Sequence, residues 1–429
     1  MKRQIQRCGL MCTMLAAGLL SAAGQRQARC EDEAGLTTIF NGKDLEGWDG
    51  DPRLWSVVDG AIRGKTTKEN PARGNTFCVW KGGRLKNFVL KLKFRIQNGN
   101  SGVQYRSTHH GDWRVGGYQA EVENNPGKVG FLYHERGRGW MTNVGDFMIV
   151  DKDGKKNVVG KVADVNALKE AGYYKMKDWN EYTITARGNH LVHDLNGYQT
   201  VEMIDDDPKG RAMEGILALQ IHAGPPMVVE FKDIRIRHLK ADYGEAIRLF
   251  NGENLDGWVT SGDAMKETFS VENGVLSIGG RPAGYIRTTE DYTNFVLRMQ
   301  VRHITRGNGG ILVRIIGEDK VWPKSMEAQG MAGSMGDFFS IGGFLFKGPA
   351  DRTRGRHIRK AHDSNEEPLG QWNNYEVTLD GGDLEIKVNG LVQNTATECE
   401  EVSGKIGLQS EGCQMEYRNI VLIPILPGE

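Results

Sequence analysis

Residues 39–48 read IFNGKDLEGW, and residues 249–258 read LFNGENLDGW, so one ten-residue pattern occurs twice in the chain. Further paired landmarks follow in the same order, namely NFVL at 87–90 and 294–297, WNEY at 179–182 with WNNY at 372–375, and GILALQ at 215–220 with GKIGLQ at 404–409. Matching landmarks in one order are typical of a tandem duplication. The sequence therefore predicts two copies of one domain over residues 36–239 and 247–425, joined by a linker over 240–246.

Apolar residues in each copy recur with the period of two that is typical of β-strands. Every second residue from Phe88 to Ile96 is apolar, which predicts a strand with one buried face. The 57 glycines fit many short strands joined by tight turns, and residues 164–171 are the clearest helix candidate. We therefore predict an all-β fold in which each copy packs two antiparallel sheets against each other.

The chain begins with a stretch that is typical of a secretory signal peptide. Basic residues at positions 2, 3 and 7 precede an apolar run over about residues 9–20 and small residues at 21–23. This run is shorter than the roughly 20 residues that a membrane-spanning helix needs. We predict a signal peptide over residues 1–23, a periplasmic or extracellular location and no stable membrane anchor. The sequence leaves open whether Cys399 and Cys413 form a disulfide there.

The charge balance of the chain narrows the choice of partners. Lysine and arginine together number 55 and balance the 55 aspartates and glutamates. Such a chain has no overall basic field, which argues against nucleic acid or an anionic membrane surface as a partner. A basic run, RTRGRHIRK at 352–360, is interpreted as a solvated loop rather than a binding patch.

The ordered landmarks of both copies resemble those of the 3-keto-disaccharide hydrolase family, formerly a domain of unknown function. The resemblance covers nearly all of the chain that follows the predicted signal peptide. It implies two tandem concanavalin-like jelly-roll sandwiches, export, and action on 3-keto-glycosides.

The family's Asn-Ser-Gly segment with a following Arg occurs in the first copy as Asn100, Ser101, Gly102 and Arg106. Arg106 would offer a planar donor fork to sugar oxygens, or it would pair with a structural acid. Gln119, Glu121 and Glu123 share one face of a predicted strand, because residues two apart on a strand point the same way. The family's Glu and Gln stand there in reversed order. A solvated sheet face is the other interpretation of these three residues.

A second set of polar residues completes the predicted site. His222 follows Gln220 by two residues and shares its face, while Tyr133, His134 and Glu135 form another polar cluster. The tryptophans that are freer to stack on a sugar ring are Trp80, Trp113, Trp140 and Trp322. We predict that Arg106, Glu121 and His222 are catalytic. The predicted substrate-binding residues are Asn100, Ser101, Gln119, Glu123, Tyr133, His134 and Gln220 in the first copy, with Arg314, Glu327, Gln329 and Gln409 in the second.

Besides a structural or surface-assembly role, which the sequence leaves open, two classes of function fit these residues. A ketone at C3 of a sugar makes the C2 proton acidic, so Glu121 or His222 as base would start elimination of the glycosidic oxygen, with Arg106 stabilising the enolate. The alternative is a non-catalytic, lectin-like protein in which duplication adds avidity. A carbohydrate is the predicted partner in both cases. The sequence leaves open a divalent metal ion as cofactor, because His109 and His110 lack the spacing of a zinc motif.

Overall fold

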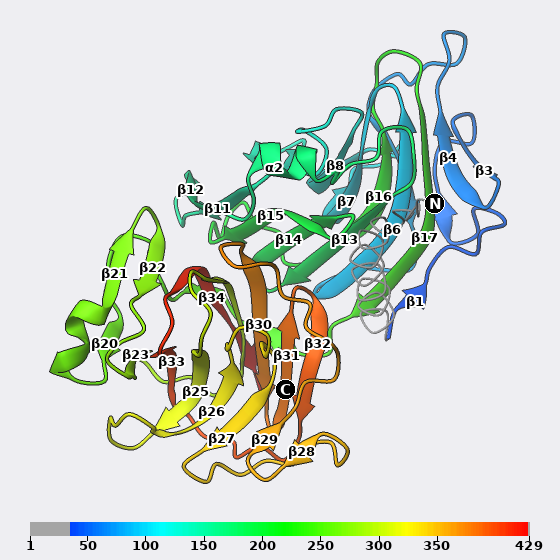
Figure 1. Cartoon of the computed structure of the whole chain (residues 1–429). Helices are drawn as coiled ribbons and strands as arrows, with labels where there is room; N and C mark the ends of the chain where they lie inside the picture. The colour runs from blue at the N-terminus through cyan, green and yellow to red at the C-terminus, as the bar shows by residue number, and fades with distance from the viewer. Residues whose placement is uncertain (1–34, 428–429) are drawn as a thin grey trace, which may run out of the picture.

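A computed structural model of the chain describes residues 35–427 (Figure 1). The predicted signal peptide, residues 1–23, lies outside the described residues. Within the described part, no helix is both long enough and apolar enough to cross a membrane. The predicted helix at 164–171 is confirmed as α2 (Val165–Glu170), whose first turn is capped because the Asp164 carboxylate accepts hydrogen bonds from the Asn166 and Ala167 amides. A 3-10 helix, η1 (Asp263–Thr268), precedes a strand of the second copy.

The first copy is a sandwich of two sheets, here called its back sheet and its front sheet (Figure 1). The strands are mostly antiparallel, and β11 pairs with β15 in parallel. The back sheet has the order β12 (Lys156–Lys161), β11 (Asp146–Val150), β15 (Tyr198–Asp205), β14 (His190–Leu195), β13 (Asn180–Arg187), β6 (Phe88–Gln97), β17 (Val228–His238), β4 (Ala61–Lys65) and β3 (Trp55–Val58), with β1 (Thr37–Thr38) beside β17. The front sheet has the order β10 (Gly139–Thr142), β9 (Leu132–Glu135), β8 (Val115–Glu123), β7 (Asn100–His109), β16 (Ile216–Ile221), β5 (Thr76–Trp80) and β2 (Trp48–Asp49).

The second copy repeats this architecture, which confirms the prediction of two tandem all-β sandwiches. Its back sheet has the order β21 (Phe269–Glu272), β22 (Val275–Ile278), β34 (Met415–Leu426), β24 (Phe295–His303), β30 (Asn373–Asp380), β31 (Asp383–Val388) and β32 (Leu391–Ala396), with β18 (Asp242–Tyr243) and β19 (Ile247–Arg248) beside β34. Its front sheet has the order β20 (Trp258–Thr260), β23 (Gly284–Thr288), β33 (Lys405–Ser410), β25 (Gly310–Ile316), β26 (Lys324–Gln329), β27 (Phe338–Ile341), β29 (His357–Ile358) and β28 (Thr353–Arg354).

Each sandwich has its own apolar core between its two sheets. The predicted alternation in β6 is confirmed, since Phe88, Leu90 and Ile96 are buried in the core of the first copy. Val103 and Tyr105 of β7 meet them from the front sheet. The residues between these core positions on each front strand therefore lie on the outer face of the front sheet.

The two copies share a buried interface. An apolar cluster joins Phe147, Val162 and Ile204 of the first copy to residues of β24 and β34 in the second copy. Beside this cluster, the Arg187 guanidinium lies 3.0 Å from the Glu376 carboxylate across the interface. The segment predicted as a linker, 240–246, includes β18, which pairs with β34.

The disulfide that the sequence left open is not formed. Cys399 and Cys413 are both buried free thiols. The Cys413 thiol instead donates to the Asn308 carbonyl oxygen at 3.0 Å, and burial raises the pKa of Cys399 to about 11. Both sulfurs are therefore held as thiols inside the second sandwich.

Candidate functional site

A network of amide and carboxyl side chains lies on the outer face of the first front sheet. We call Asn100, Gln104, Gln119, Glu121 and Gln220 the first-copy cluster, and all except the half-buried Asn100 are almost fully buried. The Gln104 amide donates to Gln119 Oε1 at 2.6 Å, and the Gln119 amide donates to Glu121 Oε2 at 2.8 Å. Asn100 donates to the other carboxylate oxygen of Glu121. Both oxygens of this carboxyl group therefore have a donor within the protein.

In the first-copy cluster, the side chain of Gln119 fills the space above Gly102. A Cβ atom placed on Gly102 would overlap the side chain of Gln119, so only glycine admits Gln119 at this position. Burial raises the pKa of Glu121 to about 7, and hydrogen bonds from Gln119 and Asn100 oppose that rise. The result is a buried carboxyl group that titrates near neutral pH while its hydrogen bonds are satisfied.

Aromatic rings border the first-copy cluster on one side. Tyr133 of β9 lies opposite Gln119 in the β-ladder, and Trp140 of β10 lies opposite Tyr133. The Trp140 indole stacks on the Phe131 ring with centroids 3.8 Å apart, while 44% of its surface stays exposed. An exposed flat indole beside polar groups has the shape and chemistry that suit one face of a sugar ring.

The equivalent place on the second front sheet holds a different network. We call Asn308, Glu327, Gln409, Glu411 and Arg356 the second-copy cluster. In the ladder between β25 and β26, Leu312 lies opposite Glu327, whereas Gln104 lies opposite Gln119 in the first copy. A leucine offers no hydrogen bond. In the part of the chain that the structure describes, Glu327 Oε1, Asn308 Oδ1 and both amide atoms of Gln409 are buried without a partner.

The unpartnered atoms converge over a bare glycine. A Cβ atom on Gly310 would lie 2.5 Å from Gln409 Oε1 and 2.8 Å from Glu327 Oε1, so both side chains flank this residue. Buried polar atoms in proteins nearly always have a hydrogen-bond partner. A group of them on one sheet face, free of intramolecular partners, is therefore suited to binding a ligand rich in hydroxyl groups.

The electrostatics of the second-copy cluster favour a protonatable carboxyl group. Burial raises the pKa of Glu327 to about 8, with a further rise from the Glu411 carboxylate, while the Arg356 guanidinium acts in the opposite direction. Burial also raises the pKa of Glu411, against a hydrogen bond from Asn308 and the charge of Arg356. Arg356 is exposed, and its guanidinium lies 5.4 Å from the centroid of Phe339, the residue opposite Glu327 in β27.

The catalytic role predicted for Arg106 is wrong. Arg106 is 1% exposed and has a φ of 45° where a β-bulge interrupts β7. Its guanidinium donates to the Lys86 and Gly188 carbonyl oxygens at 2.5 and 2.6 Å, so its donors are used to hold loops behind the sheet. The substrate-binding role predicted for Arg314 is wrong for the same reason, because that guanidinium donates to backbone carbonyl groups of Thr293, Glu400 and Gly381.

Two other predicted binding residues face away from the outer surface. The Ser101 hydroxyl is fully buried and donates to the Gln220 carbonyl oxygen at 2.6 Å. His134 lies opposite Tyr118 in the ladder and contacts its ring edge to face, with centroids 5.3 Å apart. Burial lowers the pKa of His134 to about 4, so this imidazole is neutral at physiological pH. The binding roles predicted for Ser101 and His134 are therefore wrong.

The remaining predicted residues lie on or beside the outer faces. Glu123 accepts a 3.3 Å hydrogen bond from Asn100, and Gln220 accepts one of 3.3 Å from Gln119. His222 is exposed after the end of β16, and its Nδ1 lies 2.6 Å from the Ala223 carbonyl oxygen. Gln329 accepts from the Met331 amide at 2.8 Å, which fixes the turn after β26.

Four residues of these clusters, and Phe339 beside them, are not predicted from the sequence. Gln104 follows Gly102 by two residues, which is the signal that could identify it, and Phe339 belongs to no motif. Arg356 was assigned to a solvated loop, while Asn308 and Glu411 stand where the first copy has Asn100 and His222. Among residues 35–427, no group of three or more His, Cys, Asp or Glu side chains is placed to hold a metal ion, so we assign no metal site to His109 and His110.

Comparisons with known proteins place the chain in a family. No curated protein matches it. Similar solved structures include a candidate glycosyl hydrolase from Parabacteroides distasonis (22% identity, 42% of this chain and 94% of that chain, TM-score 0.34), a carbohydrate binding module, CBM66, from Bacillus subtilis (13%, 38% and 93%, 0.30) and a Bacillus licheniformis β-glucanase (10%, 43% and 99%, 0.33). The model of the 3-keto-alpha-glucoside-1,2-lyase-like domain matches residues 35–237 and again residues 245–423. The chain therefore belongs to the 3-keto-alpha-glucoside-1,2-lyase-like family and carries two tandem copies of its domain.

Proposed function

We propose that this protein is an exported enzyme that cleaves 3-keto-glycosides, and that the second-copy cluster performs the cleavage. Membership of the family supports the substrate class. One observation carries the choice of site: Glu327 is a buried carboxyl group with an unpartnered oxygen and a pKa raised to about 8. A carboxyl group with these properties is able to take up a proton and return it near neutral pH.

The proposed reaction is an elimination that needs one base. The Glu327 carboxylate removes the proton from C2, and the electron pair of that bond forms an enolate whose charge lies on the C3 oxygen. The ketone then re-forms, a double bond forms between C1 and C2, and the C1–O glycosidic bond breaks. The leaving oxygen takes the proton back from Glu327, and water later adds across the double bond to give the 3-keto sugar.

The other members of the cluster have roles that follow from their charge and position. Arg356 is the cation that acts on both Glu327 and Glu411, so it stabilises the enolate oxygen in the role first predicted for Arg106. The free amide of Gln409 donates to and accepts from sugar hydroxyl groups. Phe339 supplies a flat apolar surface beside them.

The decisive experiment follows the mature protein acting on 3-ketotrehalose in D2O. We expect release of 3-ketoglucose with deuterium incorporated at C2, and a fall of at least about 100-fold in kcat for Glu327→Gln, because general-base catalysis typically contributes 10²–10⁴-fold. Glu253→Gln, which changes an exposed glutamate of the same copy, should leave kcat unchanged. Release of 3-ketoglucose without deuterium at C2 would contradict the elimination.

The first copy supports a second function, carbohydrate binding without catalysis. Both carboxylate oxygens of Glu121 already accept hydrogen bonds, which weakens it as a base, yet Trp140 is exposed and held flat against Phe131. We propose that the first copy holds a saccharide while the second cleaves it, an arrangement in which linked sites raise the effective concentration of substrate. A variant at Trp140 tests this binding, which it should weaken without changing kcat.

A further inference from the structure

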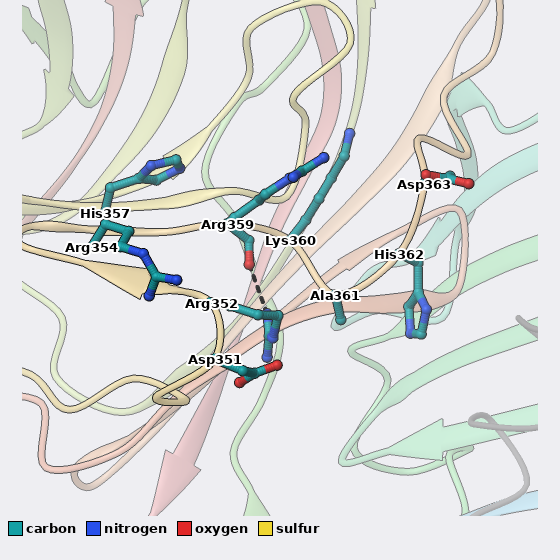
Figure 2. Close-up of a pocket in the computed structure, with 9 residues that line it drawn as sticks. All are labelled: Asp351, Arg352, Arg354, His357, Arg359, Lys360, Ala361, His362 and Asp363. Carbon is teal, nitrogen blue, oxygen red and sulfur yellow. Dashed lines mark hydrogen bonds between the residues drawn. The ribbon is translucent and has the colours of Figure 1, made fainter.

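The basic run of the second copy encloses a hollow beside β28 and β29 (Figure 2). Its volume is about 520 Å³. The permanent cations that line it are Arg352, Arg354, Arg359 and Lys360; His357, His362, Asp351 and Asp363 also contribute. Four permanent positive charges against two carboxylates give this hollow a positive balance, although the whole chain is neutral.

Three of these cations form no ion pair within residues 35–427. The Arg352 guanidinium donates to the Arg359 carbonyl oxygen at 2.8 Å, as the dashed line in Figure 2 shows, and Arg354 donates to the Thr353 carbonyl oxygen at 2.8 Å. These acceptors are uncharged. Within residues 35–427, no carboxylate forms an ion pair with Arg352, Arg354 or Arg359, whereas Lys360 lies 3.7 Å from Glu366. These three guanidinium groups are therefore not held by ion pairs in the described part of the chain, and positive charges outnumber carboxylates in the hollow.

The hollow adjoins the second-copy cluster through one aromatic pair. His357 lines the hollow and stacks on Phe339 with ring centroids 4.2 Å apart and planes 1° from parallel. Phe339 lies opposite Glu327 in the ladder. A saccharide bound at the second-copy cluster would thus have a neighbouring substituent beside His357, at the edge of the positively charged hollow.

We propose that this hollow binds the carboxylate or sulfate group of an acidic saccharide. Guanidinium forks match the planar or trigonal oxygen atoms of such anions and form charge-assisted hydrogen bonds with them. A neutral sugar would leave these charges without a counterion. The inference takes from the proposed function only that the ligand is a saccharide.

Titration calorimetry on the mature protein at low ionic strength tests the proposal with two matched pairs of probes. One pair is trigalacturonate and its methyl ester, and the other is a sulfated disaccharide and its unsulfated form. We expect at least one charged probe to bind about tenfold or more tightly than its neutral partner, with an affinity that falls as salt rises. The pair that shows the difference identifies the anion as carboxylate or sulfate.

Variants locate the binding. The double variant Arg354→Gln/Arg359→Gln should lose about tenfold or more in affinity for the charged probe. Arg73→Gln, which removes an exposed positive charge from the first copy, should not. Equal binding of charged and neutral probes, or unchanged affinity in the double variant, would overturn the proposal.

The proposal fails independently of the proposed function. The charged probes carry no 3-keto group, so their binding is measured without any cleavage. Binding of a charged probe without cleavage of any 3-keto-glycoside would refute the activity and uphold the hollow. Cleavage of 3-ketotrehalose without binding of either charged probe would uphold the activity and refute the anion site in the hollow.

Discussion

The two copies place a buried carboxyl group on the same sheet face, yet they treat it in opposite ways. In the first copy Gln104 starts a chain of amide hydrogen bonds that ends on one oxygen of Glu121, and Asn100 donates to the other oxygen. In the second copy Leu312 occupies the position of Gln104, and Glu327 keeps an oxygen without a partner. The exchange of Gln104 for Leu312 thus accompanies the change from a carboxyl group whose two oxygens both accept hydrogen bonds to one that keeps an oxygen without a partner.

The comparison is tested most strongly by removing each carboxyl group in turn. We expect Glu327→Gln to lower kcat for a 3-keto-disaccharide by about 10²–10⁴-fold, because an amide cannot accept the C2 proton. Glu121→Gln should leave kcat within about twofold of the unchanged protein, since its network allows an amide. Steady-state kinetics on both variants checks this. A larger loss from Glu121→Gln would assign catalysis to the first copy.

The raised pKa of Glu327 also predicts how stability changes with pH. Its folded pKa of about 8 lies above the ordinary value near 4.3, so its protonated form stabilises the fold and that contribution is lost as pH rises from about 4.5 to 8. The free energy of unfolding should be measured in urea at pH 5 and at pH 9. Between these values the unchanged protein should lose about 4 kcal/mol more than Glu327→Gln does. An identical loss in both proteins would place the carboxyl group in contact with water.

Exchanging the residue that distinguishes the copies should alter catalysis moderately. In Leu312→Gln, the new amide would donate a hydrogen bond to the Glu327 carboxylate and lower its pKa. The midpoint of the rise in kcat with pH should therefore move below pH 8. At high pH, kcat should fall about tenfold because the carboxylate is a weaker base. A pH–rate profile measures both effects. Gln104→Leu serves as the reciprocal control and should change neither. An unmoved profile in Leu312→Gln would show that the leucine is not what leaves Glu327 free.

The smallest expected effect concerns binding by the first copy. Trp140→Ala should weaken binding of the disaccharide about five- to tenfold, because stacking on an aromatic ring contributes of order 1 kcal/mol, while kcat stays unchanged. Equilibrium binding is measured in a Glu327→Gln background to prevent turnover. Trp322→Ala removes a comparably exposed indole, 46% against 44%, from the second copy and is the matched control. A fall in kcat with Trp140→Ala would contradict separate roles for the copies.

The fold was predictable from the sequence because its signals are local and occur twice. Paired landmarks reveal a duplication without any knowledge of distance, and the alternation from Phe88 to Ile96 reports one buried face of a strand. The same alternation put Gln119 and Glu121 on one face of a strand, and in the structure a hydrogen bond joins these two side chains.

The candidate site was predicted only in part because side-chain direction depends on features that alternation does not reveal. A bulge after Tyr105 gives Arg106 a positive φ and turns its guanidinium behind the sheet, and the same conformation recurs at Arg314. The role of Glu327 depends on Leu312 opposite it, and which residues lie opposite each other is a property of strand register. The basic hollow forms because β28 and β29 pair as a hairpin, which brings the charged residues of 352–360 together. The sequence shows these residues only as a basic run.

The buried interface between the copies makes each copy depend on the other for its stability. Phe147, Val162 and Ile204 meet strands of the second copy, and Arg187 and Glu376 neutralise each other where water is scarce. Separating the two copies would expose an apolar patch on each and would deprive Arg187 of its carboxylate, whereas Glu376 would keep Arg298 and Lys387 beside it. The duplication has therefore become hard to reverse. Substitutions on the outer face of either front sheet leave this interface intact, provided that the residues that join the two copies are kept.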